Sequence, residues 1–518
     1  MRDGERTKRS AVHPADHLLE RRDLLWMVGL TIVGLAFRLF YFSGYGLGDD
    51  VIFRADIDSI VRRGVVMPDN SSYRVTWWLP TVFSCRMFGL NEVGLIVPIT
   101  AMATVGMLLI YIFGKTLWRR PGAVIATLLL IVFPLDFAWS TMFTNDFYVA
   151  VLSALTVLLV LRALNENRAL RRRWLWILAG VSLLAAYHAK VSAVLLLPAI
   201  AIICWTRRRE VDREFAYFVL TVGVLTAVSC FVWYRYSGDP FWPYNSETRF
   251  SGVTGPDALV NHPLSRDVFL TYPRLLAWPD HLGDRLYSVY PHLLVVLAIL
   301  APFFGVRTSA PIFWWFLFVI LGLQFAVNHV PGGWTSGARN VRHTIIFIYP
   351  MTLLLTGYLV GFWRRFPKLC YALLVPLLVY GALQCVSTAT KTKVAYADRK
   401  HALEFIMALP PKPIYSDFQL CIYASLFGSR PDQFPCRELN GDERVRRAQI
   451  AAIQSGYLVT GGGREPHYGC FECIPQAADV PEDGWRLLAH LPGPDDPVPW
   501  RPDPLRVWER VADGAPPP

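Results

Sequence analysis

Long apolar segments recur along the chain as far as residue 390. A membrane-spanning helix needs roughly 17–25 mostly apolar residues. Segments of this kind cover 24–43, 93–114, 123–140, 146–164, 215–234, 286–306, 310–328, 343–362 and 369–389. A further apolar stretch, 174–206, is broken at Lys190 and predicts two short helices, 174–189 and 191–206. The pattern therefore predicts a mainly α, polytopic membrane helical bundle of about eleven spans.

The pattern changes after residue 390. Strand-like runs alternate with helical patterns over the rest of the chain. The expected strands are 413–415, 457–460, 486–491 and 505–511, and the expected helices are 398–408 and 443–455. We therefore expect a tail at 1–23, a transmembrane domain at 24–390 and a small α/β extramembrane domain at 391–518.

Charge separates the two parts of the chain. The formal net charge is +11, but residues 391–518 hold 15 basic and 17 acidic residues, so the excess lies among the apolar segments. This distribution indicates membrane topology and excludes a nucleic-acid partner. With the N-terminus inside, the inner segments carry 21 basic residues in 56 positions and the outer ones 13 in 122. An odd number of spans then places the C-terminal domain outside, in the periplasm of a bacterial inner membrane.

Two of the outer loops are long, 44–92 and 235–285. In the first, apolar positions recur at near-helical spacing over 51–63 among charged residues, which predicts a helix along the membrane interface. The second is rich in Pro, Trp and Tyr and predicts a loop that packs against the membrane surface.

Four of the nine cysteines lie in the C-terminal domain: Cys421, Cys436, Cys470 and Cys473. In an exported domain they could form two disulfides, with three possible pairings. The Cys470–Cys473 spacing resembles a redox pair, but we expect a structural disulfide that joins it to Cys421 or Cys436.

Carboxylates stand at two outer ends of the predicted spans. Asp49 and Asp50 follow the first span, where they could cap the helix over 51–63 or carry chemistry. Asp146 lies in the tight turn between the third and fourth spans and faces the same side of the membrane. Carboxylates at a membrane boundary are costly unless they are solvated or paired.

Basic residues gather at the same side. Lys190 occupies the turn within 174–206, and Arg339, Arg342 and His343 open the tenth span, where a helix would place all three on one face. Each alone would most often anchor a helix end in the headgroups. Together with the carboxylates they suit an anionic lipid headgroup.

This set meets the needs of glycosyl transfer from a lipid phosphate. A carboxylate must take the proton of the acceptor hydroxyl, and cations must stabilise the charge that grows on the departing phosphate. We assign the base to Asp49, with Asp50 and Asp146 as further catalytic candidates. Lys190, Arg339 and Arg342 are the phosphate-binding candidates, and His343 is a weaker one.

The motifs resemble the C-type glycosyltransferase superfamily, in the branch of protein O-mannosyltransferases and lipid A aminoarabinose transferases. The acidic pair followed by Phe53, the Trp77–Pro80 stretch, Thr144-Asn145-Asp146, Lys190 and the cluster 339–343 carry the resemblance. Trp485–Leu488 and Leu505–Trp508 are similar to the exported domain that closes many bacterial members. Asp50 stands where the family usually has Glu, and the histidine–proline element of the first loop is missing.

The resemblance implies a polyprenyl-phosphate sugar donor, catalysis by the first acid of the pair and inversion of the anomeric centre. The acceptor would be a glycan, a lipid or a protein of the cell envelope. Metal use varies across the superfamily, which leaves a divalent metal open, but no ligand cage stands out here and no cofactor is predicted. A transporter or flippase of lipid-linked sugars would place its charges near mid-bilayer in broken helices. A glycan polymerase or ligase would share the lipid-phosphate donor, but such enzymes usually place their largest outer loop late in the chain.

Overall fold

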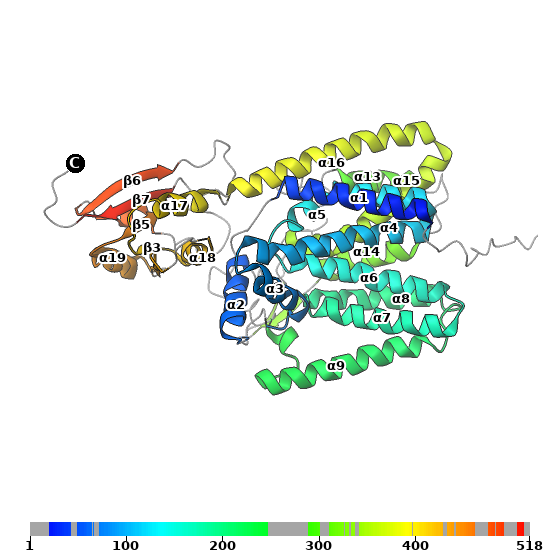
Figure 1. The fold of residues 1–518 in the computed structure, drawn as a ribbon. Coiled ribbons are helices and arrows are strands. Elements are labelled where there is room, and N and C mark those ends of the chain that lie inside the picture. Colours follow the sequence, from blue (N-terminus) through cyan, green and yellow to red (C-terminus); the bar gives the residue numbers. More distant parts are fainter. Residues whose placement is uncertain are drawn as a thin grey trace, which may run out of the picture. The chain divides into compact units, whose positions relative to one another are not determined.

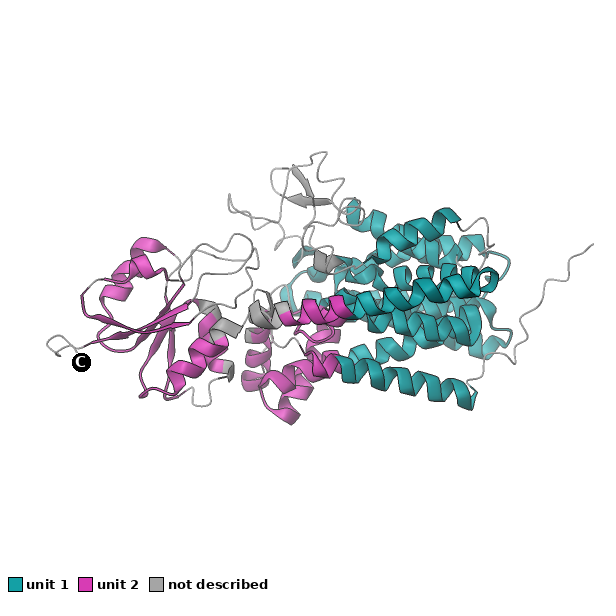
Figure 2. Cartoon of the chain, turned by 90° about the horizontal axis from the view of Figure 1, so that it is seen from above, with its two compact units in different colours: residues 1–37, 102–136, 146–382 teal, residues 38–101, 137–145, 383–518 magenta. Residues whose placement is uncertain are grey.

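The computed structural model describes the chain in stretches. The described residues are 20–42, 49–64, 66, 72–246, 289–300, 310–325, 327–330, 333–336, 341–395, 397–427, 432–439, 442–461, 475–481, 483–491 and 505–511. Side chains are outside the description at 49–52, 55, 327–330, 333–336, 341–343, 391–395, 397–399, 418, 419 and 422. The chain divides into two compact units, one of residues 1–37, 102–136 and 146–382, the other of residues 38–101, 137–145 and 383–518 (Figure 2).

Helices make up most of the first unit (Figure 1). The helices that lie in it wholly or in part are α1 (Arg21–Phe40), α4 (Glu92–Ile131), α6 (Asp146–Asn165), α7 (Ala169–Tyr187), α8 (Leu196–Thr206), α9 (Phe215–Ser237), α13 (Tyr290–Leu300), α14 (Ala310–Gln324), α15 (Ile348–Arg365) and α16 (Pro367–Ala395). Within the described residues, six helices are long and apolar enough to cross a membrane. The chain is therefore an integral membrane protein with the predicted helical fold class, while the total of eleven spans stays a prediction.

The packing of α6, α7 and α9 forms one side of this unit. The three helices lie side by side (Figure 1). Ser182 donates a hydrogen bond to the carbonyl of Leu152 over 3.0 Å, which joins α7 to α6. The Trp176 and Phe215 rings, 5.1 Å apart, join α7 to α9.

One predicted span is wrong in its bounds. The segment 123–140 does not form one helix, because α4 ends at Ile131 and Pro134 opens the short helix α5 (Pro134–Trp139). Proline has no backbone N–H to continue a helix but fits its first turn. The predicted boundary between 93–114 and 123–140 appears inside α4 as a break at Trp118 and Arg119, where Arg119 has φ 62°.

The break predicted at Lys190 is confirmed. Helix α7 ends at Tyr187, Lys190 has an extended backbone, and the 3₁₀ helix η2 (Val191–Leu195) leads into α8. Two further features escaped the sequence pattern. Strands β1 (Val327–Val330) and β2 (Gly333–Ser336) form an antiparallel hairpin, and the 3₁₀ helix η5 (Val341–Phe347) precedes α15.

The second unit contains two helices of the first long loop. Helix α2 (Asp49–Arg63) covers the predicted interfacial helix. Helix α3 (Val75–Phe88) was not predicted, because Pro80 stands inside it. The two helices pack together through Phe53 and Trp77, whose rings lie 5.3 Å apart.

A five-stranded mixed sheet forms the C-terminal part of the same unit (Figure 1). Its order is β4 (Cys436–Glu438), β3 (Ile414–Ser416), β5 (Tyr457–Thr460), β7 (Leu505–Arg510) and β6 (Trp485–Leu491). The first three strands are parallel, and β7 is antiparallel to both of its neighbours. Three helices accompany them, α17 (Ala397–Met407), α18 (Phe418–Phe427) and α19 (Glu443–Ala451). The predicted α/β pattern is confirmed.

The cysteine prediction is corrected here. Cys421 bonds to Cys436, with Cα atoms 5.1 Å apart. Neither is therefore available to Cys470 or Cys473, which lie outside the described residues. The pairing follows from the topology, because β4 is hydrogen-bonded to β3, the strand that leads into α18.

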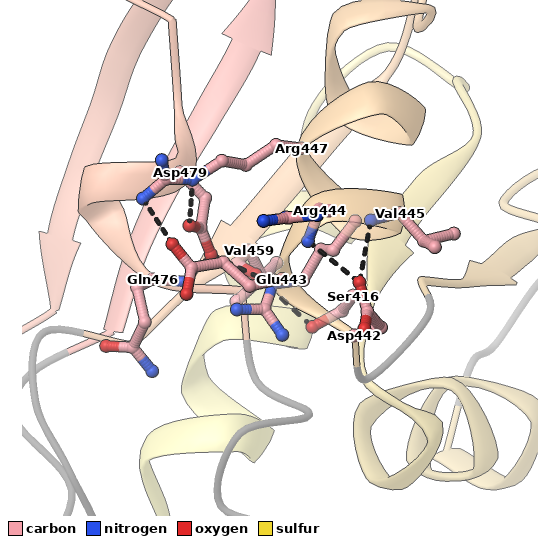
Figure 3. A network of polar contacts seen from close by, with 10 residues as sticks. Ser416, Asp442, Glu443, Arg444, Val445, Arg447, Val459, Gln476 and Asp479 are labelled. Carbon is pink, nitrogen blue, oxygen red and sulfur yellow. Dashed lines mark hydrogen bonds and ion pairs between the residues drawn. The ribbon is translucent and has the colours of Figure 1, made fainter.

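Asp479 joins α19 to the segment before β6 (Figure 3). Its carboxylate accepts hydrogen bonds from Arg446 at 2.9 Å, Arg447 at 3.0 Å and the backbone N–H of Gln476 at 3.0 Å. Burial alone would raise the pKa of Asp479, but the hydrogen bonds from Gln476, Arg447 and Arg446 outweigh it and lower the pKa. Arg446 and Asp479 are both buried.

Replacement of Asp479 by alanine is expected to destabilise the sheet domain by about 3–5 kcal/mol, because it leaves the Arg446 charge buried without its carboxylate. Glu443→Ala, which removes an exposed partner of Arg447, should cost under about 1 kcal/mol. Amide hydrogen exchange of β5 in the full-length protein measures both. Since the pKa of Asp479 is lowered, its contribution is present above its ordinary value of 3.8 and is lost as the pH falls through the native pKa. Equal protection of β5 in the Asp479→Ala and Glu443→Ala variants would contradict the stabilising role of Asp479.

Candidate functional site

The structure brings together two predicted site residues in the first unit, Asp146 and Lys190. Asp146 opens α6, where the positive end of the helix dipole favours a carboxylate. Lys190 Nζ lies 2.5 Å from Asp146 Oδ1, and the two side chains are 11% and 1% exposed. The lysine therefore ends in a buried ion pair with Asp146.

The backbone around Lys190 fixes its direction. Its N–H donates to the carbonyl of Ala186 at 3.0 Å, and its own carbonyl accepts from Ala193 at 3.1 Å. The turn is tied to α9 by His188, whose Nε2 lies 3.1 Å from Ser229 Oγ. These contacts hold the turn between α7 and η2 on both sides.

The acidic pair begins α2. Asp49 and Asp50 are the first two residues of this helix, and their side chains lie outside the description. Their position at a helix start fits the capping alternative, and it leaves the catalytic assignment untested.

The basic cluster falls largely outside the described residues. Arg339 is not described, and Arg342 and His343 are described in their backbone only, within the 3₁₀ helix η5. Their predicted common face therefore stays a prediction.

A corner of α2 and α3 holds residues that sequence reasoning passed over. We call Phe53, Tyr73, Arg74, Trp77 and Phe143 the α2–α3 corner. The guanidinium of Arg74 lies 4.9 Å from the centre of the Phe53 ring and 5.4 Å from that of Tyr73. The Trp77 ring lies 5.3 Å from both Phe53 and Phe143. The Trp77–Pro80 motif marked this region, but only as a loose likeness.

Two more arginines of the second unit are buried. Arg38, at the end of α1, is fully buried and donates to Ser140 Oγ at 2.8 Å. Arg54 of α2 is 1% exposed. Buried guanidinium groups are rare unless they are paired or take part in binding. Neither was singled out from the sequence.

Three comparisons place the chain among known proteins. Residues 75–234 match the family model described as Dolichyl-phosphate-mannose-protein mannosyltransferase. No curated protein matches the sequence. Among solved structures, the chain is similar to ArnT from Cupriavidus metallidurans bound to undecaprenyl phosphate, with 14% identity, a TM-score of 0.57, and coverage of 95% of this chain and 99% of the other. The apo structure of the same ArnT gives a TM-score of 0.56 at the same identity and coverage.

The family match covers α3 and the helices through most of α9, where Asp146 and Lys190 lie. The structural match extends over nearly the whole chain, including the C-terminal sheet domain. The chain therefore has the fold of these ArnT structures, and its residues 75–234 match a mannosyltransferase family model, in agreement with the resemblance of its motifs.

Proposed function

We propose that this protein is a glycosyltransferase that moves a sugar from a polyprenyl-phosphate donor to an acceptor at the outer face of the membrane. The observation that carries the proposal is the buried Lys190–Asp146 pair. A buried ion pair is often no more stable than apolar residues of the same volume, so a pair kept inside a helical bundle favours a functional role. Binding of a lipid phosphate supplies one, and the similar ArnT structure contains undecaprenyl phosphate.

The proposed reaction assigns a role to each candidate. The Asp49 carboxylate takes the proton of the acceptor hydroxyl as its oxygen attacks the anomeric carbon. The new glycosidic C–O bond forms while the bond from that carbon to the phosphate oxygen breaks, and the electron pair leaves with the phosphate. Attack from the side opposite the leaving group inverts the anomeric centre.

The cations act on the leaving group. Lys190 would donate to the phosphate oxygens, and Arg339, Arg342 and His343 would add charge to the same group. Asp146 would hold Lys190 in place, and Asp50 would support Asp49. In this scheme Asp146 and Asp50 position Lys190 and Asp49 and do not themselves contact the reacting atoms.

The proposed orientation puts the N-terminus in the cytoplasm and residues 391–518 in the periplasm of a bacterial inner membrane. The distribution of basic residues supports it. The Cys421–Cys436 disulfide gives independent support, because disulfides persist in oxidising compartments and are rare in the cytosol. In this orientation the C-terminal domain stands on the side of the acceptor, which we propose to be a glycan, a lipid or a protein of the cell envelope.

A donor panel tests the function. The purified protein in detergent is offered undecaprenyl phosphate carrying different sugars, with a crude envelope extract as the source of acceptors. We expect at least one donor to lose its sugar to an acceptor and to yield free undecaprenyl phosphate. Intact donors throughout the panel, with the protein folded, would contradict transfer and favour a flippase.

A further inference from the structure

Arginines gather at the end of α6 and α7 that lies away from Asp146 and Lys190. Helix α6 begins at Asp146 and runs for 20 residues, about 30 Å of helix. The stretch 162–173 covers the turn from α6 to α7, and the stretch 207–214 joins α8 to α9. Arg207 donates to Asn165 Oδ1 at 2.7 Å, which brings the two stretches together. We call them the arginine end, and they hold nine arginines and four acids.

Each acid of the arginine end already has an arginine partner. The pairs are Glu166 with Arg171, Glu210 with Arg207, Asp212 with Arg172, and Glu214 with Arg173 and Arg213. Four arginines have no carboxylate partner among the described residues: Arg162, Arg168, Arg208 and Arg209. The arginine end therefore carries cations that the acids of the same stretches do not neutralise.

Arg162 differs from the other three in its surroundings. It lies in the last turn of α6 and is half-buried, and the residues on either side of it, Leu161 and Ala163, are buried. Arg171, which acts on it electrostatically, is also a cation. A charge withdrawn from water is costly unless it is paired. A half-buried guanidinium beside a second one therefore favours an anion from outside the chain.

Exposed apolar side chains surround the arginine end. Leu170, Trp174 and Trp205 are 66%, 56% and 66% exposed. The guanidinium of Arg208 lies 5.6 Å from the centre of the Trp205 ring. Exposed indoles at the end of a membrane span are typical of the level of the lipid headgroups. The anion that meets Arg162 at this level is therefore one that is attached to acyl chains.

A basic helix end alone is not a lipid site. Exposed arginines on the inner loops set the orientation of a membrane protein without binding a particular lipid. Arg209 belongs to this class, because it is exposed and follows the end of α8. Its replacement removes the same charge as the replacement of Arg162. Arg209 therefore serves as a matched control for Arg162.

We propose that the arginine end binds the headgroup of an anionic phospholipid of the bilayer, with Arg162 as its principal ligand and Arg171 beside it. A guanidinium can donate two parallel hydrogen bonds to one phosphate group. The bound phosphate would neutralise two neighbouring cations and join α6 to α7. In the proposed orientation this end faces the cytoplasmic leaflet, which is rich in anionic lipids. The site is separate from the proposed transfer reaction, whose residues lie at the other end of the helices.

Native mass spectrometry of the full-length protein in detergent tests the proposal. The probes are phosphatidylglycerol, which is anionic, and phosphatidylcholine, which is zwitterionic. We expect the wild type to bind phosphatidylglycerol at least about tenfold more tightly, because its phosphate is not neutralised within the headgroup. Arg162→Gln should reduce this preference about fivefold or more and leave phosphatidylcholine binding unchanged. Arg209→Gln should change the preference by less than about twofold.

A second variant guards against a misfolded Arg162→Gln protein. Arg162→Lys keeps the charge but loses the paired hydrogen bonds, so its preference should lie between those of the wild type and Arg162→Gln. Equal losses in Arg162→Gln and Arg209→Gln would overturn the proposal, because they would show a diffuse basic surface. Displacement of the bound lipid by millimolar inorganic phosphate would overturn the assignment to a lipid.

The lipid site and the proposed transfer can fail separately. Lys190→Gln should bind phosphatidylglycerol as the wild type does, because Lys190 lies at the other end of the helices. A protein with the expected lipid preference but without sugar transfer would support the lipid site and contradict the proposed function. A protein that transfers sugar without any preference for phosphatidylglycerol would overturn the lipid site alone.

Discussion

Asp49→Asn is expected to lower the rate of sugar transfer by about 10²–10⁴-fold, the range that a positioned general base contributes. Asparagine keeps the shape and can still cap α2, but it cannot take the proton of the acceptor hydroxyl. Binding of the donor should change by less than about twofold, because the base acts in the transition state and not on the lipid phosphate. Single-turnover kinetics with saturating donor separates the two effects.

The same helix offers a matched control for Asp49. Asp58 pairs with Arg62 one turn later, and both side chains are well exposed. Asp58→Asn changes the charge of α2 by the same amount, but such an exposed pair contributes little. We expect transfer within about twofold of the wild type, since exposed surface pairs rarely contribute more. Undiminished transfer in Asp49→Asn would exclude Asp49 as the base and leave helix capping as its role.

Lys190→Gln is expected to lower transfer by about 10²–10³-fold, the usual effect of removing one group that stabilises developing charge. Asp146→Asn should also lower it, because the carboxylate no longer holds the ammonium group in place. The double variant should lose little more than either single one, since the two side chains form one unit. A double-mutant cycle of transfer rates measures this coupling.

An ion pair on the neighbouring helices controls for general damage to the bundle. Arg173 of α7 pairs with Glu214, which precedes α9, at 3.1 Å. Arg173→Gln should leave the transfer rate within about twofold of the wild type, because the pair has no role in the proposed reaction and Arg213 still lies 3.6 Å from the buried Glu214 carboxylate. Strictly additive losses in the Asp146 and Lys190 variants would contradict a shared role.

The helices were predictable because their signal is long and repeated. A run of about 20 apolar residues has few explanations other than a membrane span, and α6 begins and ends within a residue of its predicted bounds. The break at Lys190 was predictable because a charged residue there interrupts a long apolar run. Shorter elements carried weaker signals. Helix α3 was not predicted because Pro80 lies inside it. The hairpin of β1 and β2 was not predicted because its short strands follow directly after an apolar span.

The site was predictable only as a set of residues on one side of the membrane. The predicted topology places Asp146 and Lys190 in outer turns. They stand 44 residues apart in the sequence, however, and their contact depends on how α6 packs against α7. The α2–α3 corner was beyond reach for a related reason. Trp77 and Phe143 are ordinary apolar residues in the sequence, and their contact depends on how α3 packs against the segment before α6.

Transfer in proteoliposomes tests the central claim most directly. The donor is undecaprenyl phosphate with a labelled sugar, restricted to the leaflet that the C-terminal domain faces, and the acceptor is supplied on the same side. We expect free undecaprenyl phosphate to appear in equal amounts with glycosylated acceptor in the wild type, and neither above background in Asp49→Asn. Movement of the intact labelled lipid to the other leaflet, without release of undecaprenyl phosphate, would contradict the account.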